Sequence, residues 1–192
     1  MNDFTLYFEE GWNHIISKDA LDHQLFIVAL AAIYLVNDWK KVLILVTAFT
    51  IGHSLTLALS VFDIIRVDSK WVEFLIPLTI VITAIQNFLG TEKHYGQYRM
   101  QYWLALFFGL IHGLGFANTI RFMLADSQSI TLPLLSFNIG LEVGQLLVVG
   151  LILVISYLVV NTLKLKRKWW VWALSGIAFI VSAYICIERW PL

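Results

Sequence analysis

The sequence contains little cysteine and little charge, and both shortages exclude classes of protein. Cys186 is the single cysteine of the 192 residues, so neither an intrachain disulfide nor a cysteine metal cluster can form. Charged residues make up 14% of the composition, against about 25% in soluble domains. Lys and Arg number 13, as do Asp and Glu, so the net charge is zero and no basic stripe favours a nucleic acid partner.

Hydrophobic residues are abundant instead, at 59% of the chain, and they occur in long runs. A membrane-spanning helix needs about 20 mainly apolar residues. The runs predict an all-α integral membrane protein, a bundle of about six transmembrane helices with a polar site at its midplane. We expect one transmembrane domain over 21–192, with helices at about 21–36, 42–62, 71–89, 101–124, 132–160 and 169–187.

Residues 1–20 differ from the rest because they mix acids with aromatic residues. This mixture predicts an amphipathic lead-in that lies at the extracytoplasmic membrane surface. Tryptophans occur near the ends of the predicted spans, as an aromatic belt at the membrane interface requires. They are Trp39, Trp71, Trp103, Trp169, Trp170 and Trp190.

The basic residues predict an orientation, because cytoplasmic loops carry an excess of Lys and Arg. Eight lie in alternate connections, namely Lys40, Lys41, Lys93, Arg99, Lys164, Lys166, Arg167 and Lys168. The opposite side holds five, namely Lys18, Arg66, Lys70, Arg121 and Arg189. We therefore expect the first set in the cytoplasm and both termini outside it.

Polar residues inside the predicted spans indicate a site at the midplane. Asn138, Glu142 and Gln145 are spaced i, i+4 and i+7 and share one helix face. At 1.5 Å per residue, His53, His112 and Glu142 each lie about 16 Å from a membrane face, which is close to the middle of the bilayer. We expect these three residues to converge, supported by Thr50, Ser54, Asn138 and Gln145.

A second polar cluster is expected where the chain first enters the membrane. It comprises His14, Asp19, Asp22 and His23. Imidazole and carboxylate ligands suit nickel, cobalt, zinc or iron. Asp22 can equally be a helix N-cap. His94, in the predicted loop between the third and fourth helices, is expected to be solvated.

Each polar residue also has a structural interpretation. A membrane histidine or amide often joins neighbouring helices by a hydrogen bond. Glu142 can persist in lipid as a protonated acid bonded to a hydroxyl group. The pairs Gly109/Gly113 and Gly140/Gly144 favour close helix contact, within the chain or with a second copy.

Five segments resemble the HupE/UreJ family of small membrane proteins. They are Gly11–Ile15, Asp22–Phe26, Phe49–Leu57, Phe108–Ala117 and Phe137–Gln145. The resemblance implies a nickel or cobalt permease of the bacterial inner (plasma) membrane. It also implies metal-handling roles for His14, Asp22, His23, His53, His112 and Glu142, with Asn138 and Gln145 as their neighbours.

Three functions remain open at this point. The first is a permease or channel that captures a divalent metal at the outer cluster and holds it at the midplane. The second is an intramembrane metal-dependent hydrolase in which Glu142 acts as the general base. The third is a membrane scaffold with a structural polar core. The expected partners are the lipid bilayer and a metal ion, and a homo-oligomer is possible through the glycine faces.

Overall fold

The computed structural model describes residues 2–90, 98–123 and 130–192, without the side chains of residues 19, 98–100 and 118. The described residues form helices and no strand, which confirms the predicted all-α class. The helices are α1 (Asp3–Ile16), α2 (Leu21–Ala31), α3 (Trp39–Val61), α4 (Ser69–Leu89), α5 (Tyr98–Met123), α6 (Thr131–Tyr157) and α7 (Arg167–Glu188). Short turns η1 (Lys18–Ala20) and η2 (Val36–Asp38) flank α2, and a π-helical turn, η3 (Leu158–Thr162), continues α6.

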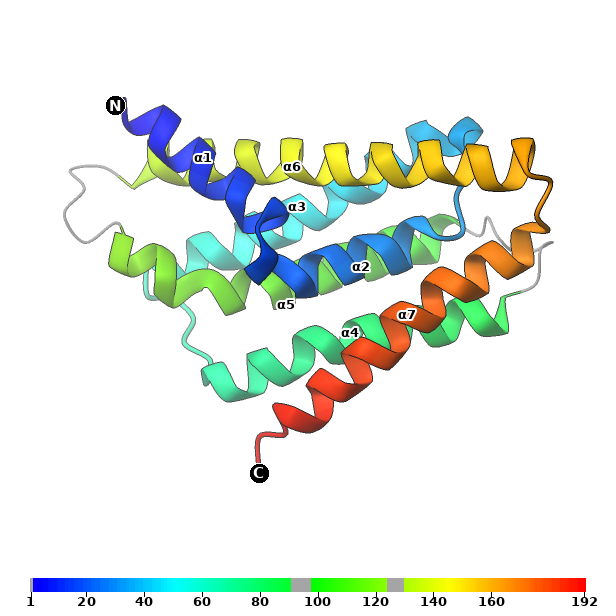
Figure 1. Cartoon of the computed structure of the whole chain (residues 1–192). Helices are drawn as coiled ribbons and strands as arrows, with labels where there is room; N and C mark the ends of the chain where they lie inside the picture. The colour runs from blue at the N-terminus through cyan, green and yellow to red at the C-terminus, as the bar shows by residue number, and fades with distance from the viewer. Residues whose placement is uncertain (1, 91–97, 124–129) are drawn as a thin grey trace.

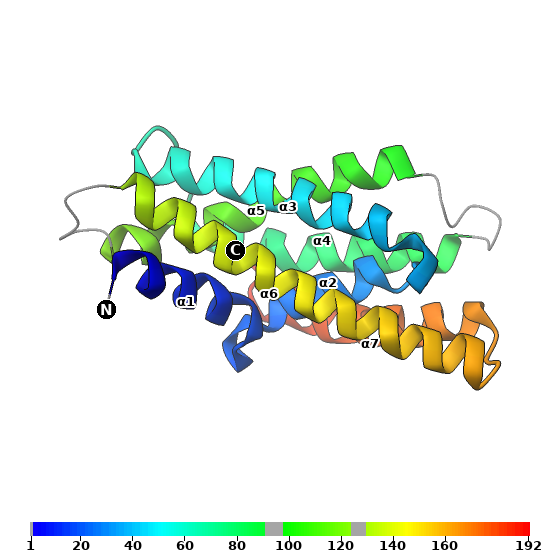
Figure 2. The same cartoon turned by 90° about the horizontal axis from the view of Figure 1, so that it is seen from above.

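The helices pack mainly as pairs, with α3 against α5, α1 against α6, and α4 against α7 (Figures 1 and 2). Helix α2 contacts α4, α6 and α7 and so joins two of these pairs. Asn87 of α4 strengthens this junction, because its amide donates to the Ala29 carbonyl of α2 at 2.7 Å and to Ser175 Oγ of α7 at 2.9 Å. Interhelical hydrogen bonds of this kind contribute on average about 0.6 kcal/mol in membrane bundles.

The N-terminal part of the chain differs from the prediction. The expected span 21–36 is wrong in length, because α2 has 11 residues and is about 17 Å long, roughly half of a bilayer core. Residues expected as a surface lead-in form α1, which packs along the first half of α6 (Figure 1). One short helix therefore stands where the surface lead-in was expected, and a second, joined to it at 17–20, stands where a full-length span was expected.

Helix α2 ends early because other groups satisfy the backbone beyond it. The guanidinium of Arg167 donates to the Ile33 carbonyl. The Asp38 carboxylate accepts a hydrogen bond from the Leu35 N–H at 3.4 Å. The backbone N–H of Asp38 donates to the Leu35 carbonyl at 2.8 Å. These bonds replace the ones that a continued α-helix would have made.

The other predicted helices agree with α3 to α7 to within three residues at each end. Four helical segments among the described residues are long and apolar enough to cross a membrane, namely Val36–Val61, Ser69–Leu89, Thr131–Thr162 and Arg167–Glu188. Shorter apolar stretches, Leu21–Ala31 and Gln101–Ala117, accompany them in α2 and α5. The chain is thus a multi-pass membrane protein, and its described residues hold four such long segments where six spans were expected.

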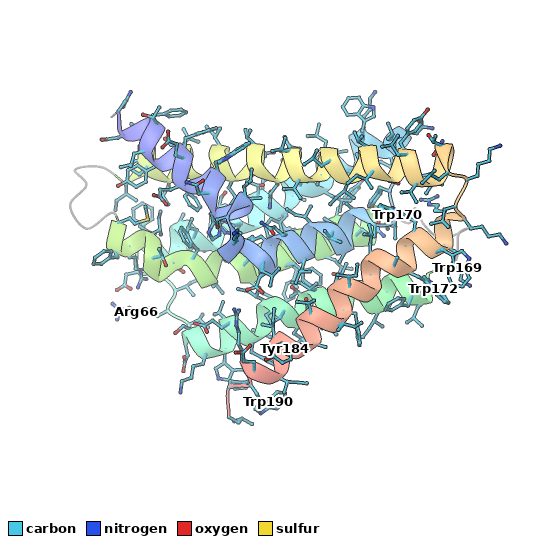
Figure 3. All side chains as sticks on the ribbon, in the orientation of Figure 1. Arg66, Trp169, Trp170, Trp172, Tyr184 and Trp190 are labelled. Atoms are coloured by element: carbon cyan, nitrogen blue, oxygen red, sulfur yellow. The ribbon has the colours of Figure 1, made fainter. Side chains whose placement is uncertain are left out.

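Large apolar side chains cover the outside of the bundle, as a lipid environment requires. Leu55, Phe107 and Leu151 are more than half exposed on three different helices. Figure 3 shows Trp169 and Trp172 together at the start of α7 and Trp190 at the other end of this helix. Aromatic residues thus occur at both ends of a spanning helix, as the aromatic-belt prediction expects.

Glycine allows the closest approach in the α1–α6 pair. A Cβ atom on Gly11 would lie 2.0 Å from the Phe137 carbonyl oxygen, and one on Gly140 would lie 2.1 Å from the Phe8 oxygen. We expect Gly11→Ala and Gly140→Ala each to destabilise the fold by about 1–3 kcal/mol, because the two backbones must move apart. Thermal unfolding of the purified protein in detergent measures this loss.

Gly150→Ala provides the matched control. This glycine is also in α6, and a Cβ atom added to it would meet nothing within 4 Å. The control is expected to keep or slightly raise stability, because alanine is the better helix former by about 1 kcal/mol. Equal destabilisation in all three variants would contradict the proposed role of the α1–α6 contact.

Candidate metal site

Four histidines from four different helices lie together in the interior of the bundle. They are His14 of α1, His23 of α2, His53 of α3 and His112 of α5. The imidazole centroids of His14 and His23 are 4.6 Å apart, and those of His23 and His112 are 4.9 Å apart. The His53 centroid lies 6.0 Å from that of His14 and 6.2 Å from that of His23. We call these four residues the histidine cluster.

Three members of the cluster can approach a single ion. Each of His14, His23 and His53 offers a ring nitrogen within 4.8 Å of the nitrogens offered by the other two. Nitrogens bound to one metal at about 2.1 Å lie about 3 to 4 Å apart, so small side-chain movements would complete the geometry. No cysteine or carboxylate belongs to this group within the described residues.

Buried nitrogens in the cluster have unused hydrogen-bonding capacity. His53 is fully buried, and neither of its ring nitrogens makes a hydrogen bond of normal geometry among the described residues, although the Asn138 side chain lies beside the ring. Nε2 of His14, Nε2 of His23 and Nδ1 of His112 also find no hydrogen-bond partner among these residues. Thr79 Oγ1 lies 3.4 Å from His112 Nε2. A buried polar atom without a partner costs about 1–3 kcal/mol, and a bound metal ion would remove that cost.

Glycines place the histidines at their positions. Gly11 and Gly109 each precede a cluster histidine by three residues, so glycine and imidazole lie about one helical turn apart. Gly109 packs against the Phe49 carbonyl and Gly113 against the His53 carbonyl, so closely that added Cβ atoms would lie 2.1 and 2.2 Å from the two oxygens. These contacts place His53 and His112 at one level of the α3–α5 pair, as the count along the two helices predicts.

Phenylalanine rings enclose the cluster. Phe116 lies 4.1 Å from the His14 ring, centroid to centroid, and stacks on Phe137 at 5.0 Å. Phe49 lies 5.2 Å from His112, and Phe26 lies 5.4 Å from the same ring. An apolar shell of this kind limits water access and strengthens electrostatic interactions inside it.

A cavity of about 300 Å³ leads to the cluster. His14, His23 and His112 line it from within the bundle. Asp22, Glu73 and Arg189 supply its charged groups, and Glu73 is exposed to solvent. The cavity therefore extends from the surface, past charged side chains, to three histidines of the cluster, whereas His53 lies beyond the cavity lining.

The expected division into an outer cluster and a midplane trio is wrong in its spatial grouping. His14 and His23 join His53 and His112 in one cluster, because α1 packs along α6 and α2 packs against α4, α6 and α7. Asp22 turns toward Arg189, whose Nη1 donates to Asp22 Oδ2 at 2.9 Å. The side chain of Asp19, expected in the outer group, lies outside the described part of the chain.

Glu142 also lies apart from the histidines. Its Oε1 accepts a 2.7 Å bond from Thr47 Oγ1, and Thr47 precedes His53 by six residues, about 9 Å along the axis of α3. The hydrolase alternative requires Glu142 beside a metal-bound water, so this arrangement gives that alternative no general base. Ser54 donates to the Thr50 carbonyl within its own helix, at 2.7 Å.

The spacing of Asn138, Glu142 and Gln145 predicts that they share one face of α6, and the structure directs this face at α3. Thr50 Oγ1 donates to Gln145 Oε1 at 3.0 Å, next to the Thr47–Glu142 bond. The Asn138 side chain lies beside the His53 ring, and its Oδ1 is buried without a hydrogen-bond partner among the described residues. We call the residues Thr47, Thr50, Asn138, Glu142 and Gln145 the α3–α6 seam.

Comparison with known protein families gives a match along nearly the whole chain. The family model described as HupE / UreJ protein matches residues 1–189. The chain belongs to the HupE/UreJ family. No curated protein and no solved structure matches this HupE/UreJ member.

Two cavity residues of this HupE/UreJ member were missed from the sequence. Glu73 lies one turn into α4, near the start of the predicted span 71–89, and Arg189 follows α7; neither belongs to a motif. The available signal was weak, since each is one charged residue near a helix end. Their partners are decided by packing between helices that are distant in sequence.

We expect the purified protein to bind one Co²⁺ or Ni²⁺ ion per chain. His23→Ala and His53→Ala should each weaken this binding by about tenfold or more, because each removes one nitrogen ligand. Isothermal titration and the visible spectrum of Co²⁺ measure the affinity and the ligand set. His94→Ala is the control, since His94 is the remaining histidine of the sequence and lies outside the described residues. Unchanged affinity in both cluster variants would contradict the assignment.

Proposed function

We propose that the protein is a permease or channel for a divalent transition metal ion, which the histidine cluster binds during passage. The observation that carries this proposal is the convergence of His14, His23 and His53 ring nitrogens within 4.8 Å at the inner end of a surface cavity. Histidines serving only as structural contacts would be expected to use their ring nitrogens in hydrogen bonds. Several here find none among the described residues.

The ligand chemistry favours nickel or cobalt, with zinc or iron as related candidates. Neutral imidazole suits these borderline ions and suits neither calcium nor magnesium. Membership of the HupE/UreJ family supports nickel and cobalt over the others. A set of imidazoles without thiolates binds with moderate strength, which is what transport requires, because an ion held too tightly would not leave.

The polar groups suggest a route through the bundle. An ion would arrive through the cavity beside Asp22 and Glu73, reach His14 and His23, and then His53. The α3–α6 seam continues from His53, because Asn138 lies beside that ring and Glu142 lies further along α3. Glu142 would supply negative charge to an ion leaving the cluster.

The route has a direction under the proposed orientation. The lysine-rich segment 164–168 would lie in the cytoplasm and the cavity would open to the extracytoplasmic side. Inward movement of a cation is then favoured by the membrane potential, by about 2.3 kcal/mol per charge per 100 mV. Movement down this potential requires no nucleotide.

Uptake measurements test the proposal directly. Cells producing the protein should accumulate more nickel or cobalt than cells without it, and His23→Ala and His53→Ala should reduce this gain by about tenfold. Elemental analysis of washed cells, with protein amounts checked by blotting, measures the effect. Equal accumulation of nickel, cobalt, zinc and iron with and without the protein would refute a transport function.

Glu142→Gln separates binding from passage. Because Glu142 bonds to Thr47 and not to the cluster, we expect metal affinity to change less than about threefold while uptake falls by about tenfold. Ser182→Ala on α7, a buried polar residue outside the seam, is the control. If Glu142→Gln binds and transports the metal as the wild type does, Glu142 has no role in the proposed route.

A further inference from the structure

Arg189 is the single cation among the charged residues that line the cavity in the described part of the chain. Its guanidinium is paired with Asp22 of α2, with a distance of 2.9 Å between Nη1 and Oδ2. A cation at the opening of a site for cations is unexpected. The Arg189 guanidinium repels an incoming metal ion and is already paired with Asp22, the carboxylate next to His23 in the sequence.

Asp22 has capacity for a second partner. Oδ2 accepts from Arg189, whereas Oδ1 is buried and finds no hydrogen-bond partner among the described residues. In the neighbouring residue, His23, the Nε2 atom is also buried and has no hydrogen-bond partner among the described residues. A carboxylate oxygen and an imidazole nitrogen without partners, on adjacent residues that line one cavity, form a suitable first contact for a divalent ion.

Arg189 also has another carboxylate near its position. Trp190, the next residue, packs edge to face on Phe74 of α4, with ring centroids 5.1 Å apart. Glu73 precedes Phe74 and lines the same cavity. The packing of Trp190 holds the end of the chain against α4, so the guanidinium can leave Asp22 and remain beside an acid.

We infer that Arg189 is a built-in counter-cation that competes with the metal ion for Asp22. In the absence of metal it pairs with Asp22, and an arriving ion displaces it toward Glu73. Asp22, Glu73 and Arg189 together carry a net charge of −1, against −2 without the arginine. Arg189 therefore lowers the affinity of the opening and allows the ion to move on to the histidines. This inference rests on the proposed metal-binding function.

Metal titration of purified variants in detergent tests this role. Arg189→Gln should bind Ni²⁺ or Co²⁺ about tenfold more tightly than the wild type, because Asp22 loses its competitor. Arg189→Lys should fall between the two at about threefold, since lysine keeps the charge but lacks the planar fork of donors. Adding Asp22→Asn to Arg189→Gln should abolish the gain.

Arg66→Gln is the matched control. Arg66 also pairs with an aspartate, Asp63, but it lies in the exposed segment between α3 and α4 and does not line this cavity. Its loss should leave metal affinity unchanged.

The outcomes separate this inference from the proposed function. A wild-type protein that binds no metal refutes both. A wild type that binds metal, with Arg189→Gln binding equally or more weakly, refutes the competing role alone. If the glutamine variant does not purify as a monodisperse protein, the lysine variant decides, because affinity equal to or weaker than the wild type contradicts the inference.

Discussion

The structure depends on backbone contacts that only glycine permits. Gly11 and Gly140 bring α1 onto α6, and Gly52 and Gly109 bring α3 onto α5, each so closely that an added Cβ atom would lie within 2.2 Å of a facing carbonyl oxygen. In a lipid environment there is little hydrophobic driving force between helices, so close packing stabilises their association. These same contacts place the imidazoles, because His14, His53 and His112 follow the glycines by one turn or less.

The resulting site combines features that would be unfavourable in a purely structural core. Buried nitrogens lie among phenylalanine rings, several without a hydrogen-bond partner in the described residues. The break between α1 and α2 lies beside the cavity, where Ser17 and Ala20 form part of its wall. Irregular backbone inside a membrane bundle is tolerated where it lines a polar space. The N-terminal helix pair and the histidine cluster are thus parts of one arrangement.

The charged groups along the proposed route lie in two separate places. The cavity opening holds Asp22, Glu73 and Arg189, and the seam holds Glu142. Each carboxylate whose hydrogen bond is described is stabilised locally, Asp22 by Arg189 and Glu142 by Thr47. The histidine cluster between them is without formal charge while its imidazoles are neutral. A divalent ion would therefore meet acids on both sides of a neutral binding site, an arrangement suited to movement more than to retention.

The sequence by itself determined the features that depend on local periodicity. Apolar runs predicted α3 to α7, and the i, i+4 and i+7 spacing predicted the polar face of α6. Residue counts predicted the equal level of His53 and His112 but wrongly placed Glu142 at that level, since it bonds to Thr47. Tertiary structure alone decided how the polar residues are grouped. The helix break at 17–20 and the packing of α1 on α6 bring His14 and His23 to His53, and Asp22 finds its partner in Arg189, 167 positions along the chain. Periodicity indicates which residues share a face of one helix. It does not say which other helix that face meets, because the choice depends on close contacts between backbones far apart in sequence.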